Sequence, residues 1–384
     1  MIRASVKKEL LSWARKRAGL EQDALVGKFK KLPEWEAGEL QPTLKQAEDF
    51  ARAVHVPVGY LFLTEPPEES LPIPDFRTFA GQPMLRPSPN LLDTIYACQE
   101  RQSWYRDFAR ITQAPELEFI GSATIDTSPE EVATHMRNTL GFDLDAWKGC
   151  QTWTDALRLF IRQADKIGVL VMVSGVVMSN TRRKLDPSEF RGFAISDPLA
   201  PLIFINGADT KAAQIFTLAH ELAHLWLGDS ALSNIEAAPR QGFPREEVWC
   251  NAVAAELLVP ITSLRTELHT GEMLTDTLSR LARRFKVSTL VILRRLLDAG
   301  QLDRSSFEEA WKQECDRLRK ISQKGSSGGN FYKTTVARVS PRFAHALISN
   351  TLEGQTLFRD AYRMLGVAKT ETFNNLGREV GVMG

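Results

Sequence analysis

Two histidines and a glutamate lie close together in the segment FTLAHELAHLWLG, residues 216–228. His220 and His224 are four positions apart, which on a helix places them on one face, a single turn from each other. Two imidazoles in that arrangement can bind one metal ion, while Glu221 beside them can take a proton from bound water. On an ordinary core helix the same side chains would be buried among leucines and alanines without partners, at a cost of several kcal/mol. The spacing therefore predicts a metal site.

A catalytic metal site of this type needs a third protein ligand. Asp229 at the end of the predicted helix 210–228 is one source, and the next predicted helix, 245–260, is a better one. On that helix Glu247 shares a face with apolar residues, but Glu246 does so equally well. Periodicity alone leaves both glutamates open.

The two segments FTLAHELAHLWLG and EVWCNAVAAELLVP resemble the paired motifs of the ImmA/IrrE family of metallo-endopeptidases. The second family motif falls on these positions: Glu247, Asn251, Val253, Ala254, Leu257, Leu258 and Pro260. The resemblance covers about 165–300 and implies that Glu247 completes a His/His/Glu site for Zn²⁺, with Asn251 in a supporting position. Cys250 stands where the family commonly has alanine.

Three short apolar runs precede the metal motif, and they predict the strands that position it. They are GVLVMVSGVVM, FRGFAISD and APLIFINGA, each bounded by turn-forming residues. Helices are predicted at about 90–114, 129–141 and 153–166 from apolar spacing. The expected fold class is α+β and mainly helical, with a small β-sheet in a peptidase that the resemblance makes zincin-like.

The first 63 residues are predicted to be helical, and residues 32–62 resemble the Cro/repressor (XRE) type of helix-turn-helix domain. The matching pieces are the Trp-Glu-x-Gly turn at 35–38, the Pro42-Thr43 helix start and the closing Val56-Pro57. The segment between Leu25 and Trp35 is about four residues shorter than that fold supplies, where the second and recognition helices should lie.

Charge is unevenly distributed over this N-terminal region. Residues 1–31 carry nine Lys/Arg and three Asp/Glu, whereas 32–74 carry two and eight. The basic side predicts phosphate contacts from Lys28, Lys30 and Lys31. The alternative is a degenerate helical module that binds protein.

Residues 64–90 are predicted to be a proline-rich linker, in which Phe76 of the tag IPDFRT is a candidate for docking on a neighbouring domain. The segment 274–300 has the pattern of a small helix-turn-helix that we expect to pack on the peptidase core. The domains are thus predicted as 1–63, 64–90, 91–300 and 301–384.

The C-terminal region contains a second basic segment. From 317 to 352 there are seven Lys/Arg and no acid, with Phe331, Tyr332 and Phe343 interleaved. Cations between aromatic rings are typical of single-stranded nucleic-acid binding. The predicted contacts are Arg317, Arg319, Lys320, Lys333 and Arg338. An acidic protein surface is an equally good partner for the same charges.

Composition sets wider bounds. The chain has 384 residues and a net charge of +1, so two or three domains are expected and a uniformly basic nucleic-acid binder is excluded. Four cysteines without a paired spacing favour a reducing compartment. The longest apolar stretch is about half of what a membrane span needs, and we expect a cytoplasmic protein.

Two functions remain open at this point. The first is a zinc endopeptidase, with Glu221 as general acid–base, that regulates transcription or a stress or mobile-element response by cleaving a partner, above all a helix-turn-helix repressor. The second is a DNA-binding regulator, or an antitoxin-like component of a toxin–antitoxin or phage-defence system, in which the peptidase fold serves for sensing. Double- or single-stranded DNA is a possible partner in both.

Overall fold

The computed structural model describes residues 3–69, 71–75, 87–233, 244–321 and 331–383. Within it the chain divides into two compact units. Unit 1 comprises Met1–Pro72 with Leu85–Asp93, and unit 2 comprises Ile73–Met84 with Thr94–Gly384. Each unit is described by itself.

Unit 1 is a small helical bundle. Its elements are α1 (Lys8–Arg17), α2 (Gln22–Val26), α3 (Leu32–Ala37), α4 (Leu44–Ala53) and the 3₁₀ turn η1 (Val58–Phe62). The hydroxyl of Thr43 accepts from the Gln46 amide while the Gln46 side chain accepts from the Thr43 amide, so the predicted helix start at Thr43 is a complete capping box. Gly38 ends α3 at φ +82°, a left-handed conformation that favours glycine.

The short interval between Leu25 and Trp35 has a visible structural consequence. The two helices that flank this interval, α2 and α3, are each little more than one helical turn long. Phe29 and Trp35 pack against each other and into the core of unit 1 with Phe50 of α4. The shortened segment therefore folds into a packed core, and it supplies no long helix of the kind that reads a major groove.

Unit 2 is built on a mixed four-stranded sheet in the order β1-β3-β2-β4. The strands are β1 (Leu170–Ser174), β2 (Gly192–Ile195), β3 (Leu202–Asn206) and β4 (Ala231–Ser233). β1 runs parallel to β3, whereas β2 is antiparallel to both β3 and β4. The three predicted strands are confirmed. The prediction missed β4, because ALS is too short to show an alternating pattern.

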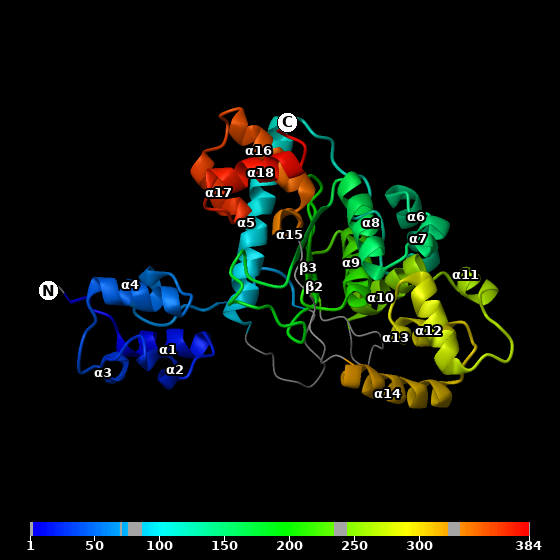
Figure 1. The fold of residues 1–384 in the computed structure, drawn as a ribbon, viewed down its shortest axis with the longest axis horizontal. Coiled ribbons are helices and arrows are strands. Elements are labelled where there is room, and N and C mark those ends of the chain that lie inside the picture. The colour runs from blue at the N-terminus through cyan, green and yellow to red at the C-terminus, as the bar shows by residue number, and fades with distance from the viewer. Residues whose placement is uncertain (1–2, 70, 76–86, 234–243, 322–330, 384) are drawn as a thin grey trace. The chain divides into compact units, whose positions relative to one another are not determined.

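Helices surround this sheet (Figure 1). The first group is α5 (Pro89–Ile111), α6 (Pro129–Leu140), α7 (Leu144–Gly149), α8 (Trp153–Lys166), α9 (Lys211–Leu227), α10 (Arg245–Leu258) and α11 (Ile261–Thr266). The second is α12 (Leu274–Phe285), α13 (Thr289–Asp298), α14 (Arg304–Ile321), α15 (Phe331–Val339), α16 (Pro341–Leu352), α17 (Phe358–Leu365) and α18 (Thr370–Glu379). The fold is mainly helical α+β, as expected.

Both faces of the sheet are covered, which explains its nearly continuous apolar strands. α8 and α9 pack on one face through Val171, Ile203 and Ile205. α5 and α15 lie on the other face, where Cys98 of α5 contacts Met172. α12 and α13 contribute Leu281, Phe285 and other residues to the same core as α9, so the segment 274–300 packs on the sheet-and-helix body as predicted.

Candidate metal centre

Helix α9 presents the two histidines on one face. Its start is fixed by Thr210, whose hydroxyl accepts from the Ala213 amide, and its end by Gly228 at φ +80°. Between those caps no residue interrupts the backbone ladder. The Nε2 atoms of His220 and His224 are 3.1 Å apart. The spacing in sequence therefore brings both ring nitrogens to one point.

Helix α10 packs against α9 and brings Glu247 to the same point. One carboxylate oxygen of Glu247 lies 3.1 Å from His224 Nε2, and the other lies 3.3 Å from His220 Nε2. The three side chains form a group whose ligand atoms all lie within 4.8 Å of one another. Glu246, the other glutamate that periodicity left open as a third ligand, is only half-buried and is not part of this group.

Glu221 lies next to the histidines and is completely buried. Neither of its carboxylate oxygens has a hydrogen-bond partner among the described residues. Burial, and then the negative charge of Glu247, raise the pKa of Glu221 well above its usual range. A carboxyl group that is costly to ionise in this environment is suited to holding and releasing a proton.

Glycine at position 192 permits the close approach of α9 to strand β2. A Cβ atom there would lie 2.5 Å from Thr217 Cγ2 and 2.9 Å from the Phe204 carbonyl oxygen. It would also stand 3.2 Å from a carboxylate oxygen of Glu221. The absence of a side chain at Gly192 is therefore what lets the helix seat its glutamate against the sheet.

Ser233 of β4 is a neighbour of the site that sequence reasoning missed. Its hydroxyl donates to Glu247 Oε1 over 3.3 Å, and the residue is fully buried. The opposite edge of β4 is also occupied, because the Leu232 amide donates to the Pro74 carbonyl and Asp75 pairs with Leu232. Phe76, the predicted docking residue, lies outside the described residues.

The protonation states around the centre fit a bound cation. The imidazoles oppose the effect of burial and hold the pKa of Glu247 below its usual range, so Glu247 is ionised. Burial lowers the pKa of His224, which favours the neutral ring that a metal requires. His220, Glu221 and His224 are 0% exposed and Glu247 is 2% exposed. Two nitrogens and one carboxylate in a dry site suit Zn²⁺.

Asn251 lies one turn after Glu247 on α10 and is not part of the His220–His224–Glu247 group. It is 9% exposed, its Oδ1 has no partner among the described residues, and it lines a cavity of about 260 Å³ with Phe216 and Ala255. It therefore stands beside the centre without touching it.

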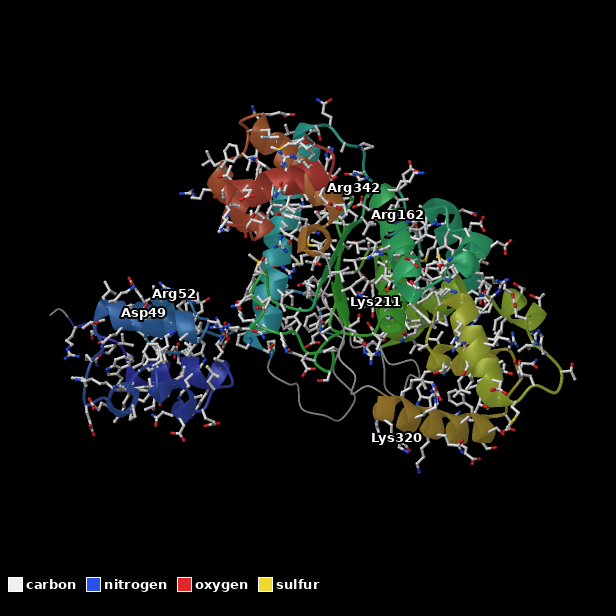
Figure 2. All side chains as sticks on the ribbon, viewed as in Figure 1. Asp49, Arg52, Arg162, Lys211, Lys320 and Arg342 are labelled. Carbon is white, nitrogen blue, oxygen red and sulfur yellow. The ribbon has the colours of Figure 1, made fainter. Side chains whose placement is uncertain are left out.

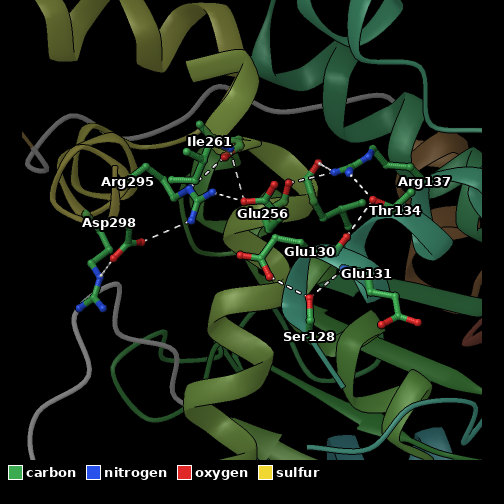
Figure 3. A network of polar contacts seen from close by, with 12 residues as sticks. Ser128, Glu130, Glu131, Thr134, Arg137, Glu256, Ile261, Arg295 and Asp298 are labelled. Atoms are coloured by element: carbon green, nitrogen blue, oxygen red, sulfur yellow. Dashed lines mark hydrogen bonds and ion pairs between the residues drawn. The ribbon is translucent and has the colours of Figure 1, made fainter. Parts of the chain in front are cut away.

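The end of α10 is held by a buried charge network (Figure 3). Arg295 of α13 forms ion pairs with Glu256 and with Asp298, and it donates to the Val259 carbonyl over 2.9 Å. Arg137 of α6 donates to the backbone carbonyl of Glu256 over 3.0 Å. These bonds fix α10 between α6 and α13, and with it the position of Glu247.

The predicted nucleic-acid contacts are scattered. Lys28, Lys30 and Lys31 are exposed in unit 1. On α14, Arg317 is paired with Glu314 at 2.6 Å, Arg319 lies 3.4 Å from Asp316, and Lys320 is exposed. Arg338 is half-buried, and burial lowers its pKa. The side chain of Lys333 lies outside the described residues.

Among the described aromatic side chains between these cations, Phe343 does not belong to the expected stacking surface. Phe343 is fully buried and packs edge-on against Trp104, so its use as a base-stacking ring is wrong. Tyr332 accepts a hydrogen bond from Asn375 through its hydroxyl. The alternation along the sequence did not reveal that α16 places Phe343 in the core, while Tyr332 is half-buried and the side chain of Phe331 lies outside the described residues.

Among the described residues, no helix has both the length and the apolar character to cross a membrane. Residues 164–297 match the model of the IrrE N-terminal-like domain family, Peptidase_M78. Residues 339–379 match a domain of unknown function, DUF8813. Neither match reaches unit 1, and no curated protein matches the chain. The region that holds the His220–His224–Glu247 group is thus similar, at the family level, to metallopeptidase-like regulators.

Proposed function

We propose that unit 2 is a zinc-dependent endopeptidase that cleaves a partner protein. The observation that carries the proposal is the meeting of His220 and His224 with Glu247, beside a buried Glu221 whose oxygens have no hydrogen-bond partner in the described part of the chain. The similarity of residues 164–297 to the IrrE N-terminal-like domain supports the same chemistry.

In this proposal His220, His224 and Glu247 hold the ion. Bound zinc would supply Lewis acidity toward a peptide carbonyl and toward water. Glu221 accepts the proton of the attacking water and passes it to the leaving amine. Ser233 orients the Glu247 carboxylate, and Gly192 keeps α9 close enough to the sheet for Glu221 to face the reacting atoms.

The partner that we propose is a regulatory protein, either a helix-turn-helix repressor or the companion protein of a toxin–antitoxin or phage-defence pair. The family resemblance supports this substrate class. The buried state of the centre is consistent with conditional cleavage, since an exposed general protease would have to admit extended chains freely.

The direct test replaces Glu221 by Gln and incubates the protein with candidate repressors and zinc. We expect Glu221→Gln to retain zinc, measured by mass spectrometry of the metal, and to lose cleavage by more than about 10²-fold. The matched control is Glu246→Gln, which changes a half-buried glutamate outside the metal group. Cleavage by Glu221→Gln at the wild-type rate would remove the enzymatic proposal.

A second candidate function is DNA binding by unit 1. It is favoured by the exposed cations Lys28, Lys30 and Lys31 and by the capping box at Thr43, which matches the helix start of the resemblance. The short α2 and α3 favour phosphate contacts over base reading. Gel-shift assays of the full chain on operator DNA test this idea. Reversing all three lysines to glutamate should weaken binding on every sequence alike; unchanged binding would leave unit 1 as a protein-binding module.

A further inference from the structure

A second cavity in unit 2 lies away from the metal group. Its volume is about 850 Å³, and residues of α5, α8, α15 and α16, with the end of α18, line it. This is within the size range of small-ligand sites. Val173 of β1 also lines it, so the cavity lies at the edge of the sheet that is opposite to β4. We refer to it as the α8–α16 cleft.

Helix α8 contributes two arginines to the cleft, one turn apart. Arg158 and Arg162 are both exposed. Arg162 has no ion-pair or hydrogen-bond partner in the described part of the chain. Arg158 has a weak one, since Asp155 is 3.8 Å away and both side chains are well exposed. Two cations on one helix face without firm counter-charges form a site for an anion.

Lys211, near the start of α9, adds to this positive charge. Burial, and then the charge of Arg158, lower the pKa of Lys211. Figure 2 shows where Lys211, Arg162 and Arg342 are placed on α9, α8 and α16. Lys211 thus lies near Arg158 but is not among the residues that line the cleft.

Arg342 of α16 is hydrogen-bonded to the end of α8. Its Nε donates to the Asp165 carbonyl over 2.8 Å, and its Nη atoms approach the Lys166 carbonyl and the Tyr105 hydroxyl at 3.3 and 3.4 Å. His345, one turn further along α16, is exposed and lines the same cleft. The hydrogen bonds of Arg342 join α16 to the end of α8.

The acids of the cleft do not neutralise the arginines of α8. The carboxylate of Asp165 already accepts from the Arg342 amide and the Ser340 hydroxyl. Glu379 stands on the far wall, at the last residue of α18. Apart from Ser349, the remaining lining is apolar or aromatic, with Tyr105 and Phe108 from α5 among it.

A ligand complementary to the arginines of α8 and to the aromatic residues of α5 carries negative charge at one end and a flat, weakly polar ring at the other. We propose that the α8–α16 cleft binds a nucleotide, either free or as part of a single strand, with its phosphate at Arg158 and Arg162. Its base would lie against the apolar wall of α5. The cleft shares Arg342 and six other lining residues with the basic segment 317–352 read from the sequence. The two arginines proposed to hold the phosphate, Arg158 and Arg162, lie on α8, outside that segment. It is independent of the proposed peptidase activity.

Binding to the full chain tests the proposal with two probes. They are a fluorescein-labelled oligothymidylate of about eight nucleotides, followed by anisotropy, and thymidine 5′-monophosphate, followed by calorimetry. We expect Arg158→Glu/Arg162→Glu to raise the Kd of the bound probe at least about tenfold. The matched control is Arg304→Glu/Lys312→Glu at exposed positions of α14, which changes the net charge equally and should alter Kd less than about twofold. Binding of the mononucleotide would identify a free nucleotide; binding of the oligonucleotide alone would identify a strand.

Several results would overturn the proposal. One is a wild-type protein that binds neither probe, and another is an equal loss in the α8 and α14 variants, which would reflect long-range charge. Competition by a polyglutamate peptide as effective as that by the oligonucleotide would instead assign the cleft to an acidic protein partner. Thermal unfolding checks that the variants are folded. If the double variant does not fold, Arg162→Gln replaces it, because Arg162 forms no hydrogen bond or ion pair with the residues that the structure describes.

Discussion

The metal group and the α8–α16 cleft lie in one unit and differ in how far their polar side chains are exposed to water. At the metal group, four polar residues are excluded from water, and none of the described residues forms a hydrogen bond to the oxygens of Glu221. In the cleft, Arg158 and Arg162 keep their charged ends in solvent. Buried polar groups of the first kind demand a specific ion to balance them. The exposed charges of Arg158 and Arg162 are solvated by water when no ligand is bound, so the cleft suits reversible binding.

The largest effect that would sharpen this contrast is expected from removing one ligand of the buried group. His224→Ala leaves the ion only two protein ligands, His220 and Glu247, which is too few to hold a catalytic ion stably. We expect zinc content to fall to background and cleavage to be lost by more than about 10³-fold. Metal analysis after dialysis measures it. His269→Ala, on an exposed position, is the control and should change neither.

The second effect concerns the network that holds α10. Arg295→Met removes a buried cation and leaves Glu256 without its ion pair, which should lower the free energy of unfolding by about 3–5 kcal/mol. Arg294→Met, whose pair with Asp298 is more exposed, should cost less than about 1 kcal/mol. Urea denaturation compares the two. Equal effects would mean that the buried network does not fix α10.

A third effect concerns the contact between helix and sheet. Gly192→Ala places a methyl group 2.5 Å from Thr217 Cγ2 and close to a backbone oxygen, so a destabilisation of about 1–3 kcal/mol is expected. Gly149→Ala is the matched control, because nothing lies within 4 Å of a Cβ there. Thermal unfolding of both variants measures the difference, and a neutral Gly192→Ala would contradict the close packing of α9.

The smallest effect is expected at Ser233. Ser233→Ala removes one hydrogen bond to Glu247 and leaves the three ligand atoms in place. Zinc affinity should fall by about tenfold, as for other partners of metal ligands. Competition with a fluorescent chelator measures it. Ser230→Ala, whose hydroxyl accepts from the Ser196 amide, is a control on the same chain segment and should leave the affinity unchanged.

The two regions also differ in how far the sequence predicted them. His220 and His224 are encoded within one helical turn, so their spacing alone indicated the site, and a resemblance chose Glu247 over Glu246. Ser233 and Gly192 were missed because their roles depend on how β4 and β2 lie against α9 and α10. The cleft joins Arg158 to Arg342, far apart in the chain, through the packing of α16 on α8. No local pattern reports a pairing of that kind.

The aromatic residues of 317–352 show the opposite failure. A local alternation of cations and rings was visible, yet Phe343 belongs to the core beside Trp104. Burial is decided by the whole unit, and a basic-aromatic pattern is common to core helices and to binding surfaces. Helix positions, by contrast, were predicted well wherever caps such as Thr210 and Gly228 bounded them.

The central claim is that one metal ion sits between α9 and α10, and anomalous diffraction at the zinc edge tests it directly. Crystals of the full chain grown with zinc should show a single strong anomalous peak within coordination distance of His220 Nε2, His224 Nε2 and a Glu247 oxygen. A map with no peak there, or with Glu247 turned away from a peak bound by other residues, would contradict the account.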